Sequence, residues 1–276
     1  MTKEQSFGPS TKCVHVGTEP DNLYGSIATP IYQTTTYAIP NVEELIARYR
    51  HRKPGYTYTS TGNPTQRAAE LKIAEVEGGE DAAVFSAGMA AITSTITTIV
   101  GHGDEVLAPN DLYGETLHFF HLLQQKMSVK THFFNTTNIG EVEDIINEHT
   151  KLLYLETPTN PTLKLVDIAR GVEIARKHDI TTVLDNTFAS PLNQKGLAMG
   201  VDVVVESATK SISGHHQAVC GVAVSNKERI RAIKLMRGQY GQTLDPFAAC
   251  MLVMGMQTLA LRIERQNSNA LALAPS

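Results

Sequence analysis

The chain has 276 residues, of which 42% are hydrophobic and 19% are charged, and its formal net charge is −4. This length fits one large domain, or one domain with part of another, and the acidic balance argues against a nucleic-acid-binding protein. Residues 1–5 are polar and lack the apolar run of a secretory signal. The apolar stretch 247–261 is too short to cross a bilayer. We therefore expect a cytoplasmic protein without a membrane segment.

The cysteines and histidines give no sign of a metal site. Cys13, Cys220 and Cys250 have neither metal-ligand spacing nor the even number of a disulfide framework, which is typical of a reducing compartment. His215 and His216 are adjacent, so their side chains diverge, and no third ligand is close in the sequence. We predict no metal.

The first part of the chain, residues 1–61, is rich in threonine, tyrosine, glycine and proline and shows little periodicity. We predict an N-terminal arm that contacts a neighbouring subunit. A turn at 62–65 then precedes a helix that ends at Gly78 and Gly79. Its expected apolar positions are Leu71, Ile73, Ala74 and Val76.

From residue 81 onward, short strand-like runs alternate with helical segments. The expected strands are 81–86, 104–108, 129–134, 152–156, 181–185, 201–205 and 221–225, and the expected helices are 89–100, 114–126, 140–149, 166–178 and 227–237. This order predicts an α/β domain over residues 62–246, with a mostly parallel sheet between two layers of helices. Residues 247–273 are expected to form one continuous linking helix.

Asp185 and Lys210 each follow an apolar, strand-like run. The carboxyl ends of parallel strands line the ligand crevice of an α/β sheet, so we expect these side chains to face the same crevice. An amine that condenses with a carbonyl and an acid that pairs with a pyridinium nitrogen are the two groups that pyridoxal 5'-phosphate (PLP) requires. The alternatives are a surface lysine, and an aspartate that caps the next turn with Asn186.

Other residues around these runs could hold the rest of such a cofactor. Ser207 and Thr209 offer hydroxyls for a phosphate, and Gly88 and Met89 open a helix whose amide groups could bind one. Tyr113 could stack on a ring and shuttle protons. Strand–glycine–helix junctions and tyrosines that pack at a helix start are also common, so each signal is weak alone.

Two further candidates lie in loops. Tyr58 belongs to a tyrosine-rich loop; it is either a plain surface residue or a phosphate ligand donated to a neighbouring subunit. Asn160 is either a plain turn residue or a hydrogen-bond donor to the 3'-oxygen of the cofactor.

The motifs of the chain resemble those of the Cys/Met-metabolism family of PLP-dependent enzymes. That family includes cystathionine γ-synthase, cystathionine γ- and β-lyases, methionine γ-lyase and homoserine-ester sulfhydrylases. The likeness runs through nearly the whole chain, with matching segments at 29–37, 58–65, 87–91, 111–114, 156–161, 185–187 and 207–210.

The resemblance implies an aspartate-aminotransferase-like fold, PLP as cofactor, and a homotetramer, a dimer of dimers with shared active sites. Matching positions imply that Lys210 is the Schiff-base lysine, that Asp185 faces the pyridine nitrogen and that Tyr113 stacks on the ring. The other implied cofactor contacts are Gly88, Met89, Asn160, Thr187, Ser207, Thr209 and, from the other subunit, Tyr58.

The chain departs from the family pattern at several positions. Ser60 stands where an arginine usually pairs with the phosphate and Ala87 where a serine is usual, which should weaken phosphate binding. Ser211 replaces a common aromatic residue, and Glu206 a frequent histidine. Glu115 stands near the expected substrate side chain and could favour a cationic substrate such as canavanine. The alternative is a glutamate placed by the helix macrodipole.

The family also has a C-terminal domain whose arginine binds the substrate carboxylate. We expect the chain to end inside the linking helix, 247–276, before that domain, and so to be incomplete for catalysis. Arg262 and Arg265 lie in this helix and are not assigned to that role.

We predict γ-elimination from a γ-substituted L-amino acid (methionine, cystathionine or a canavanine-like compound) to give an oxo acid and ammonia. Lys210 would move the protons, and Tyr113 is a candidate acid or base. The alternatives are γ-replacement by a thiol, β-elimination from cystathionine, and an inactive fragment, which Ser60 and Ala87 favour.

Overall fold

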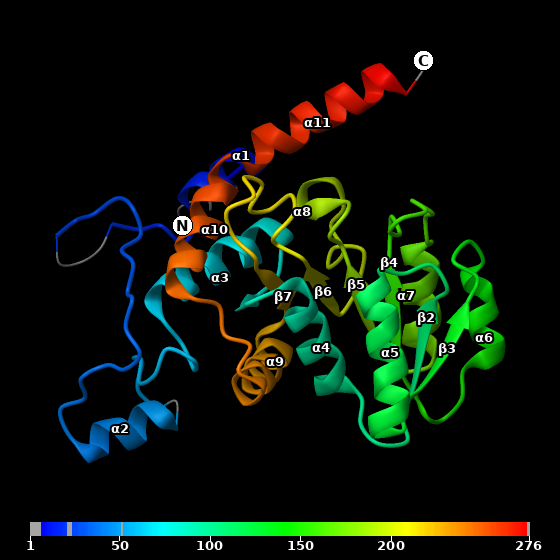
Figure 1. Cartoon of the computed structure of the whole chain (residues 1–276), viewed down its shortest axis with the longest axis horizontal. Helices are drawn as coiled ribbons and strands as arrows, with labels where there is room; N and C mark the ends of the chain where they lie inside the picture. The colour runs from blue at the N-terminus through cyan, green and yellow to red at the C-terminus, as the bar shows by residue number, and fades with distance from the viewer. Residues whose placement is uncertain (1–6, 21–23, 51, 275–276) are drawn as a thin grey trace, which may run out of the picture.

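A computed structural model describes residues 7–20, 24–50 and 52–274. Its centre is a seven-stranded sheet with the order β1-β7-β6-β5-β4-β2-β3 (Figure 1). The strands are β1 (Asp81–Phe85), β2 (Glu105–Pro109), β3 (Lys130–Phe134), β4 (Thr150–Glu156), β5 (Thr181–Asp185), β6 (Val203–Glu206) and β7 (Gly221–Ser225). β7 is antiparallel to both of its neighbours, and the other neighbouring pairs are parallel. The predicted mostly parallel α/β sheet is confirmed.

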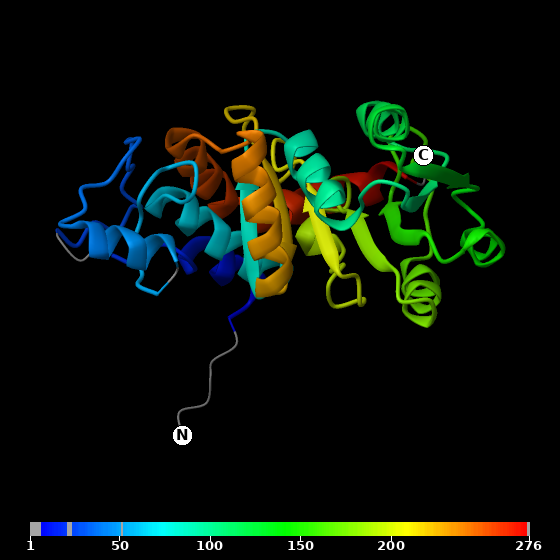
Figure 2. The same ribbon diagram turned by 90° about the horizontal axis from the view of Figure 1, so that it is seen from below.

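Helices cover both faces of this sheet (Figure 2). The helices are α1 (Pro9–His15), α2 (Val42–Tyr49), α3 (Pro64–Glu77), α4 (Gly88–Ile99), α5 (Gly114–Met127), α6 (Val142–Ile145), α7 (Ile168–Lys177), α8 (Ser190–Asn193), α9 (Lys227–Tyr240), α10 (Pro246–Gln257) and α11 (Leu259–Leu273). Because strand side chains alternate, Ala83 and Phe85 join the core under α4, α5 and α9, whereas Ala82 and Val84 join the core under α3 and α10.

The helix α3 begins and ends where its sequence predicts. The side chain of Asn63 accepts a hydrogen bond from the Thr65 amide, and Gly78 closes the helix in the left-handed conformation with a φ of 88°. Ile73, Ala74 and Val76 are buried as expected. Leu71, the other expected apolar position, is 41% exposed and lies outside the core.

Two predicted helices differ from the structure. The segment 140–149 contains only a 3-10 turn, Ile139–Glu141, and the single turn α6, because Ile146 turns to an extended conformation and Thr150 already joins β4. The expected continuous helix over 247–273 is two helices, α10 and α11, which meet at Thr258 with a bend of 54°.

The N-terminal segment contains two helices that its composition did not predict. α1 packs on α3, and there the buried ammonium of Lys72 donates hydrogen bonds to the carbonyls of Cys13 and Val14, both at 2.9 Å. α2 lies away from the sheet, at the lower left of Figure 1. Its N-terminus is capped by the side chain of Asn41.

Within the described residues, no single helix has the length and apolar character needed to cross a membrane. α10 and α11 meet that criterion only as a bent pair.

Candidate functional site

Three buried carboxyl side chains end three adjacent parallel strands. Glu156 ends β4, Asp185 ends β5 and Glu206 ends β6. Glu156 pairs in register with Asp185, and Asp185 pairs in register with Val205. The loops that follow these strands therefore meet at one edge of the sheet, where parallel α/β sheets bind ligands.

Asp185 is held in a fixed orientation at this edge. One carboxylate oxygen accepts the Thr187 amide at 3.0 Å, and the other accepts the hydroxyl of the buried Tyr154 at 3.3 Å. Burial raises the pKa of the Asp185 carboxyl, and the hydrogen bonds from Thr187 and Tyr154 oppose that rise. A buried carboxylate is costly unless a donor or cation pairs with it, as a pyridinium N–H would.

Lys210 is exposed in the tight turn that follows β6. Its amide donates to the Ser207 carbonyl at 3.1 Å, and its own carbonyl accepts the Gly214 amide at 2.9 Å. Thr187 links this turn to the Asp185 loop, because its hydroxyl oxygen accepts the Ser207 amide at 2.8 Å. The structure thus brings Lys210, Asp185, Thr187 and Ser207 into one connected cluster.

The start of α4 lies against the same turn. A Cβ added to Gly88 would lie 2.7 Å from the Cβ of Ser207 and 2.9 Å from its hydroxyl oxygen. One added to Gly221 would overlap the carbonyl of Ala87. Because Ala87 provides no side-chain cap, the first amides of α4, including that of Met89, have no side-chain hydrogen bond from the N-cap residue. This is a glycine-lined cradle at a helix N-terminus.

Thr209 uses its hydroxyl within the protein. That hydroxyl donates to the Cys220 carbonyl and accepts the Cys220 amide, both at 3.0 Å. Its proton is therefore committed, and the predicted phosphate contact of Thr209 would have to compete with this pairing.

Glu156 is a site residue to which the sequence analysis assigned no role. Its two oxygens accept the amide of Tyr113 at 3.0 Å and the amide of Asn160 at 2.9 Å. Burial, and then the charge of Asp185, raise its pKa to about 7. Glu156 therefore places both Tyr113 and Asn160 beside Asp185. The signal was available, since Glu156 ends an apolar strand in the same way as Asp185.

A second carboxyl pair lies behind the cluster. Glu206 and Glu77 are both 1% exposed, and Asn186 donates to Glu206 at 3.3 Å. Both Glu77 oxygens and one Glu206 oxygen have no hydrogen-bond partner as long as both groups are ionised. A proton on one carboxyl lets it donate to the other. Burial is the main cause that raises the pKa of Glu77 to about 8 and that of Glu206 well above its usual range, and Lys195 opposes the rise at Glu77.

Two predicted site residues lie outside the connected cluster. The Glu115 side chain is 62% exposed in the first turn of α5, where its Oε2 lies 3.8 Å from Nδ1 of His118. Tyr58 is 49% exposed in the N-terminal arm, where its backbone pairs with Thr36. Neither residue has a described contact with Asp185 or Lys210.

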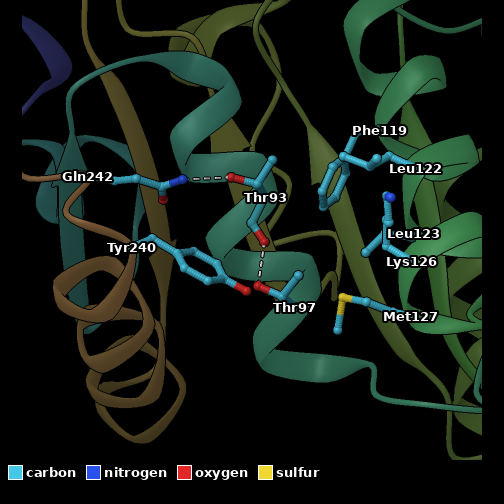
Figure 3. A pocket seen from close by; sticks show the side chains of 9 residues that line it. All are labelled: Thr93, Thr97, Phe119, Leu122, Leu123, Lys126, Met127, Tyr240 and Gln242. Atoms are coloured by element: carbon cyan, nitrogen blue, oxygen red, sulfur yellow. Dashed lines mark hydrogen bonds between the residues drawn. The ribbon is translucent and has the colours of Figure 1, made fainter.

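A hollow in the described part of the chain lies elsewhere. It has a volume of about 450 Å3 and lies between α4, α5 and α9 (Figure 3). Its lining residues are Thr93, Thr97, Phe119, Leu122, Leu123, Lys126, Met127, Tyr240 and Gln242. None of the predicted site residues lines it, so the strand-end cluster remains the candidate site. In the described part of the chain, no group of three or more His, Cys, Asp or Glu residues is placed to hold a metal ion.

Comparison with known proteins agrees with the chemistry of the cluster. Residues 10–275 match the family model described as Cys/Met metabolism PLP-dependent enzyme. An L-methionine gamma-lyase of Fusobacterium nucleatum subsp. polymorphum is 39% identical over 269 residues, which are 96% of this chain and 68% of that protein. A probable cystathionine gamma-synthase of Herpetosiphon aurantiacus is 36% identical over 97% of this chain and 82% of its own length.

A solved structure gives the same result. The crystal structure of metB from Corynebacterium glutamicum superposes with a TM-score of 0.92 at 38% identity, over 98% of this chain and 69% of that one. The aspartate-aminotransferase-like fold is thereby confirmed.

The residues of the cluster fit PLP. Gly88 and Gly221 let the start of α4 pack closely against the Ser207 turn and β7, and Ala87 leaves the first amides of α4 without a side-chain cap, so these amides can bind a phosphate. Asp185 is a buried carboxylate without a cationic partner among its hydrogen bonds. Lys210 supplies an exposed amine on the linked turn. With the family match over residues 10–275 and the close relatives, these features establish that the chain belongs to the Cys/Met-metabolism family of PLP-dependent enzymes.

Proposed function

We propose that this protein catalyses γ-elimination on a γ-substituted L-amino acid. One water is consumed, and the products are the γ-substituent, released with a proton, an oxo acid and ammonia. The observation that carries the proposal is the cluster at the sheet edge, where Thr187 connects the loop of Asp185 to the turn of Lys210. The L-methionine gamma-lyase relative supports elimination as the reaction type.

Asp185 and Lys210 would carry the two central roles in this reaction. Asp185, through its carboxylate, would hold the pyridine nitrogen in its protonated state. PLP, when bound, supplies an electron sink for the electron pair that remains on Cα after a proton leaves. Lys210 is the residue that would bind PLP covalently, and its Nζ would then remove the α-proton and return protons to the substrate.

Tyr113 is the candidate group for the departing side chain. Glu156 accepts its amide at 3.0 Å, which fixes the backbone from which the phenol extends. The phenol is at the start of α5 and 41% exposed, so it can reach a substrate that enters from solvent. We assign Tyr113 to stacking on the ring and to proton transfer at the leaving group.

The phosphate would lie at the start of α4, on the amides that follow Gly88, with the hydroxyl of Ser207 as a further donor. Asn160 and Thr187 flank the ring position. Tyr58 lies in the arm, so its role as a phosphate ligand requires a second subunit. We therefore include a homotetramer with shared sites in the proposal, and size determination by light scattering tests it.

Glu115 suggests a substrate class. Its carboxylate is two residues from Tyr113 in the chain and 62% exposed, so it faces solvent at the start of α5. An acidic group there favours a substrate with a cationic side chain, such as canavanine, over the neutral side chain of methionine.

The main alternative is γ-replacement, in which a thiol adds in place of the leaving group. The probable cystathionine gamma-synthase relative supports it. The same residues would serve both reactions, as they would serve β-elimination from cystathionine. An inactive protein is the remaining alternative, because Ser60 and Ala87 lack groups that could bind a phosphate strongly.

The first experiment tests the cofactor role of Lys210. The protein with added PLP should turn yellow, and borohydride should bleach the colour and fix the PLP mass on the peptide that contains Lys210. Lys210→Ala should abolish both results, whereas the exposed Lys227→Ala control should retain them. A labelled peptide other than that of Lys210 would refute the assignment.

The second experiment identifies the reaction. Methionine, cystathionine, canavanine and acylated homoserines are supplied with and without cysteine, and the products are analysed by mass spectrometry. Oxo acid formed without cysteine supports elimination. A thioether that forms only with cysteine would replace the proposal with γ-replacement, and the absence of both products would contradict catalysis by this chain.

A further inference from the structure

The guanidinium of Arg262 is bound to the segment that follows Lys210. It donates to the carbonyl of Ser211 at 2.6 Å and to the carbonyl of Ile212 at 3.2 Å. These are the first two residues after Lys210 in the chain. Arg262 also donates to the Gly255 carbonyl at 2.9 Å and, through Nε, to the Thr258 hydroxyl at 3.1 Å. One side chain thus connects the lysine turn to the end of α10.

The bend between α10 and α11 makes this contact possible. The helices meet at Thr258 with a bend of 54°, which turns α11 so that Arg262 reaches back to residues 211–212. At the end of α10, Gly255 lies directly against the backbone of Ser213, where an added Cβ would overlap the Ser213 carbonyl. α10 therefore contacts the lysine segment through its backbone, and α11 contacts it through Arg262.

Gly214 packs against the guanidinium of Arg262. It has a φ of +72°, and a Cβ at this position would overlap the guanidinium of Arg262. The Gly214 amide in turn donates to the Lys210 carbonyl at 2.9 Å, and the Ser213 amide donates to Ala208 at 2.9 Å. Arg262 therefore binds the carbonyls of a short backbone loop that begins at Lys210.

We propose that Arg262 is a positioning residue that fixes the backbone of Lys210, so that α10 and α11 set the position of the amine. The proposal rests on the proposed function only in that Lys210 is the residue that binds the cofactor. A planar guanidinium with several donors suits this role, because it can serve carbonyls in different directions at once, whereas a lysine ammonium acts as a point donor.

The first test needs no cofactor. Hydrogen exchange of the Ser213 and Gly214 amides is measured in the PLP-free protein for Arg262→Ala, Arg262→Lys and Arg265→Ala. Arg265 lies on the same helix but is exposed, so it is the matched control. We expect exchange about tenfold faster in Arg262→Ala, a smaller increase in Arg262→Lys and no change in Arg265→Ala, since each lost hydrogen bond is worth about 1 kcal/mol.

The second test measures the reactivity of the Lys210 amine. With PLP, Arg262→Ala should shift the pH midpoint of the visible absorbance band and slow attachment at Lys210, and millimolar guanidinium should restore both. Guanidinium should have no effect on Arg265→Ala. A purely structural role would lower the urea midpoint without moving the pH midpoint.

Two outcomes would overturn the proposal. One is exchange at Ser213 and Gly214 that is equal in Arg262→Ala and Arg265→Ala. The other is exchange that rises equally along the whole chain, which would mean general destabilisation. If the wild-type protein does not attach PLP to Lys210, the proposed function fails, and the exchange comparison still decides the role of Arg262.

Discussion

Glu156 and Asp185 lie opposite each other in register, at the ends of β4 and β5. Glu156 accepts the backbone amides of Tyr113 and Asn160, Asp185 accepts that of Thr187, and burial raises the pKa of both carboxyls. Glu156 thereby fixes the loops of Tyr113 and Asn160, whereas Asp185 binds its own loop and the hydroxyl of Tyr154. Adjacent carboxyls of the same chemistry thus serve different purposes because their partners differ.

We predict that Glu156→Gln will destabilise the protein by about 1–3 kcal/mol, because the amide nitrogen of glutamine cannot accept one of the two backbone N–H groups. Urea unfolding measures this cost. Glu141→Gln is the control, since Glu141 also accepts a backbone amide, that of Asn135, but is only partly buried. Equal losses of stability in the two variants would show that Glu156 does not hold the loops of the site more strongly than a partly buried glutamate does.

The Glu77–Glu206 pair makes stability depend on pH. An unfolded glutamate has a pKa of about 4.5, whereas burial raises the pKa of Glu77 to about 8 and that of Glu206 well above its usual range. The folded state therefore binds more protons than the unfolded state in this interval. The protonated pair makes its full contribution to the free energy of unfolding below about pH 4.5. This contribution is lost as the pH rises through about 8.

We expect Glu206→Gln to reduce this dependence. It removes one group that keeps its proton in the folded state, so the slope of the unfolding free energy between pH 5 and 8 should fall by up to about 1.4 kcal/mol per pH unit. Urea titrations at several pH values measure the slope. The exposed Glu80→Gln should leave it unchanged, and an unchanged slope in Glu206→Gln would mean that the buried pair does not retain a proton.

The cradle at the start of α4 predicts opposite results for two glycines. Gly88→Ala places a methyl group 2.7 Å from the Ser207 Cβ, so we expect a cost of about 1–3 kcal/mol and PLP binding at least about tenfold weaker. Gly238→Ala meets nothing within 4 Å inside α9, so it should stabilise the protein by about 0.5–1 kcal/mol. Thermal unfolding and PLP titration measure both, and normal PLP affinity in Gly88→Ala would remove this region from the site.

Glu115 offers a test of substrate preference. Glu115→Gln should leave stability within about 0.5 kcal/mol, because the side chain is 62% exposed. It should lower kcat/KM for canavanine relative to methionine by up to about fivefold, the range of an exposed ion pair. Glu173→Gln, at an exposed acid on α7, should leave the ratio unchanged. If neither change alters the ratio, Glu115 has no role in substrate preference, and its place at the start of α5 is explained by the helix macrodipole.

Much of the sheet was predictable because apolar runs between turn residues determine both strand and burial. Asp185 and Lys210 were predicted as site residues for the same reason, since polar residues that follow such runs have few structural uses. Glu156 ends a run in the same way, but its role depends in part on the amide of Tyr113, which is remote in the chain. Local patterns carry no information about such partners.

The errors have similar causes. The break at Thr258 has no proline or glycine at its position, and the contacts of Arg262 with residues 211–212, which accompany the bend, are tertiary ones. α1 was missed because residues 9–15 pack on α3, from a part of the chain whose composition resembles a loop. Leu71 fits the period of its helix, yet it lies on the exposed side of α3.

The position of β1 at one edge of the sheet has a consequence for biosynthesis. β1 pairs within the sheet with β7 alone, and β7 is formed by residues 221–225. During translation, residues 81–85 must therefore wait for about 140 more residues before their strand partner leaves the ribosome. The start of α4 with Gly88 follows β1 directly, so this part of the candidate site gains its strand support only after residues 221–225 have been synthesised.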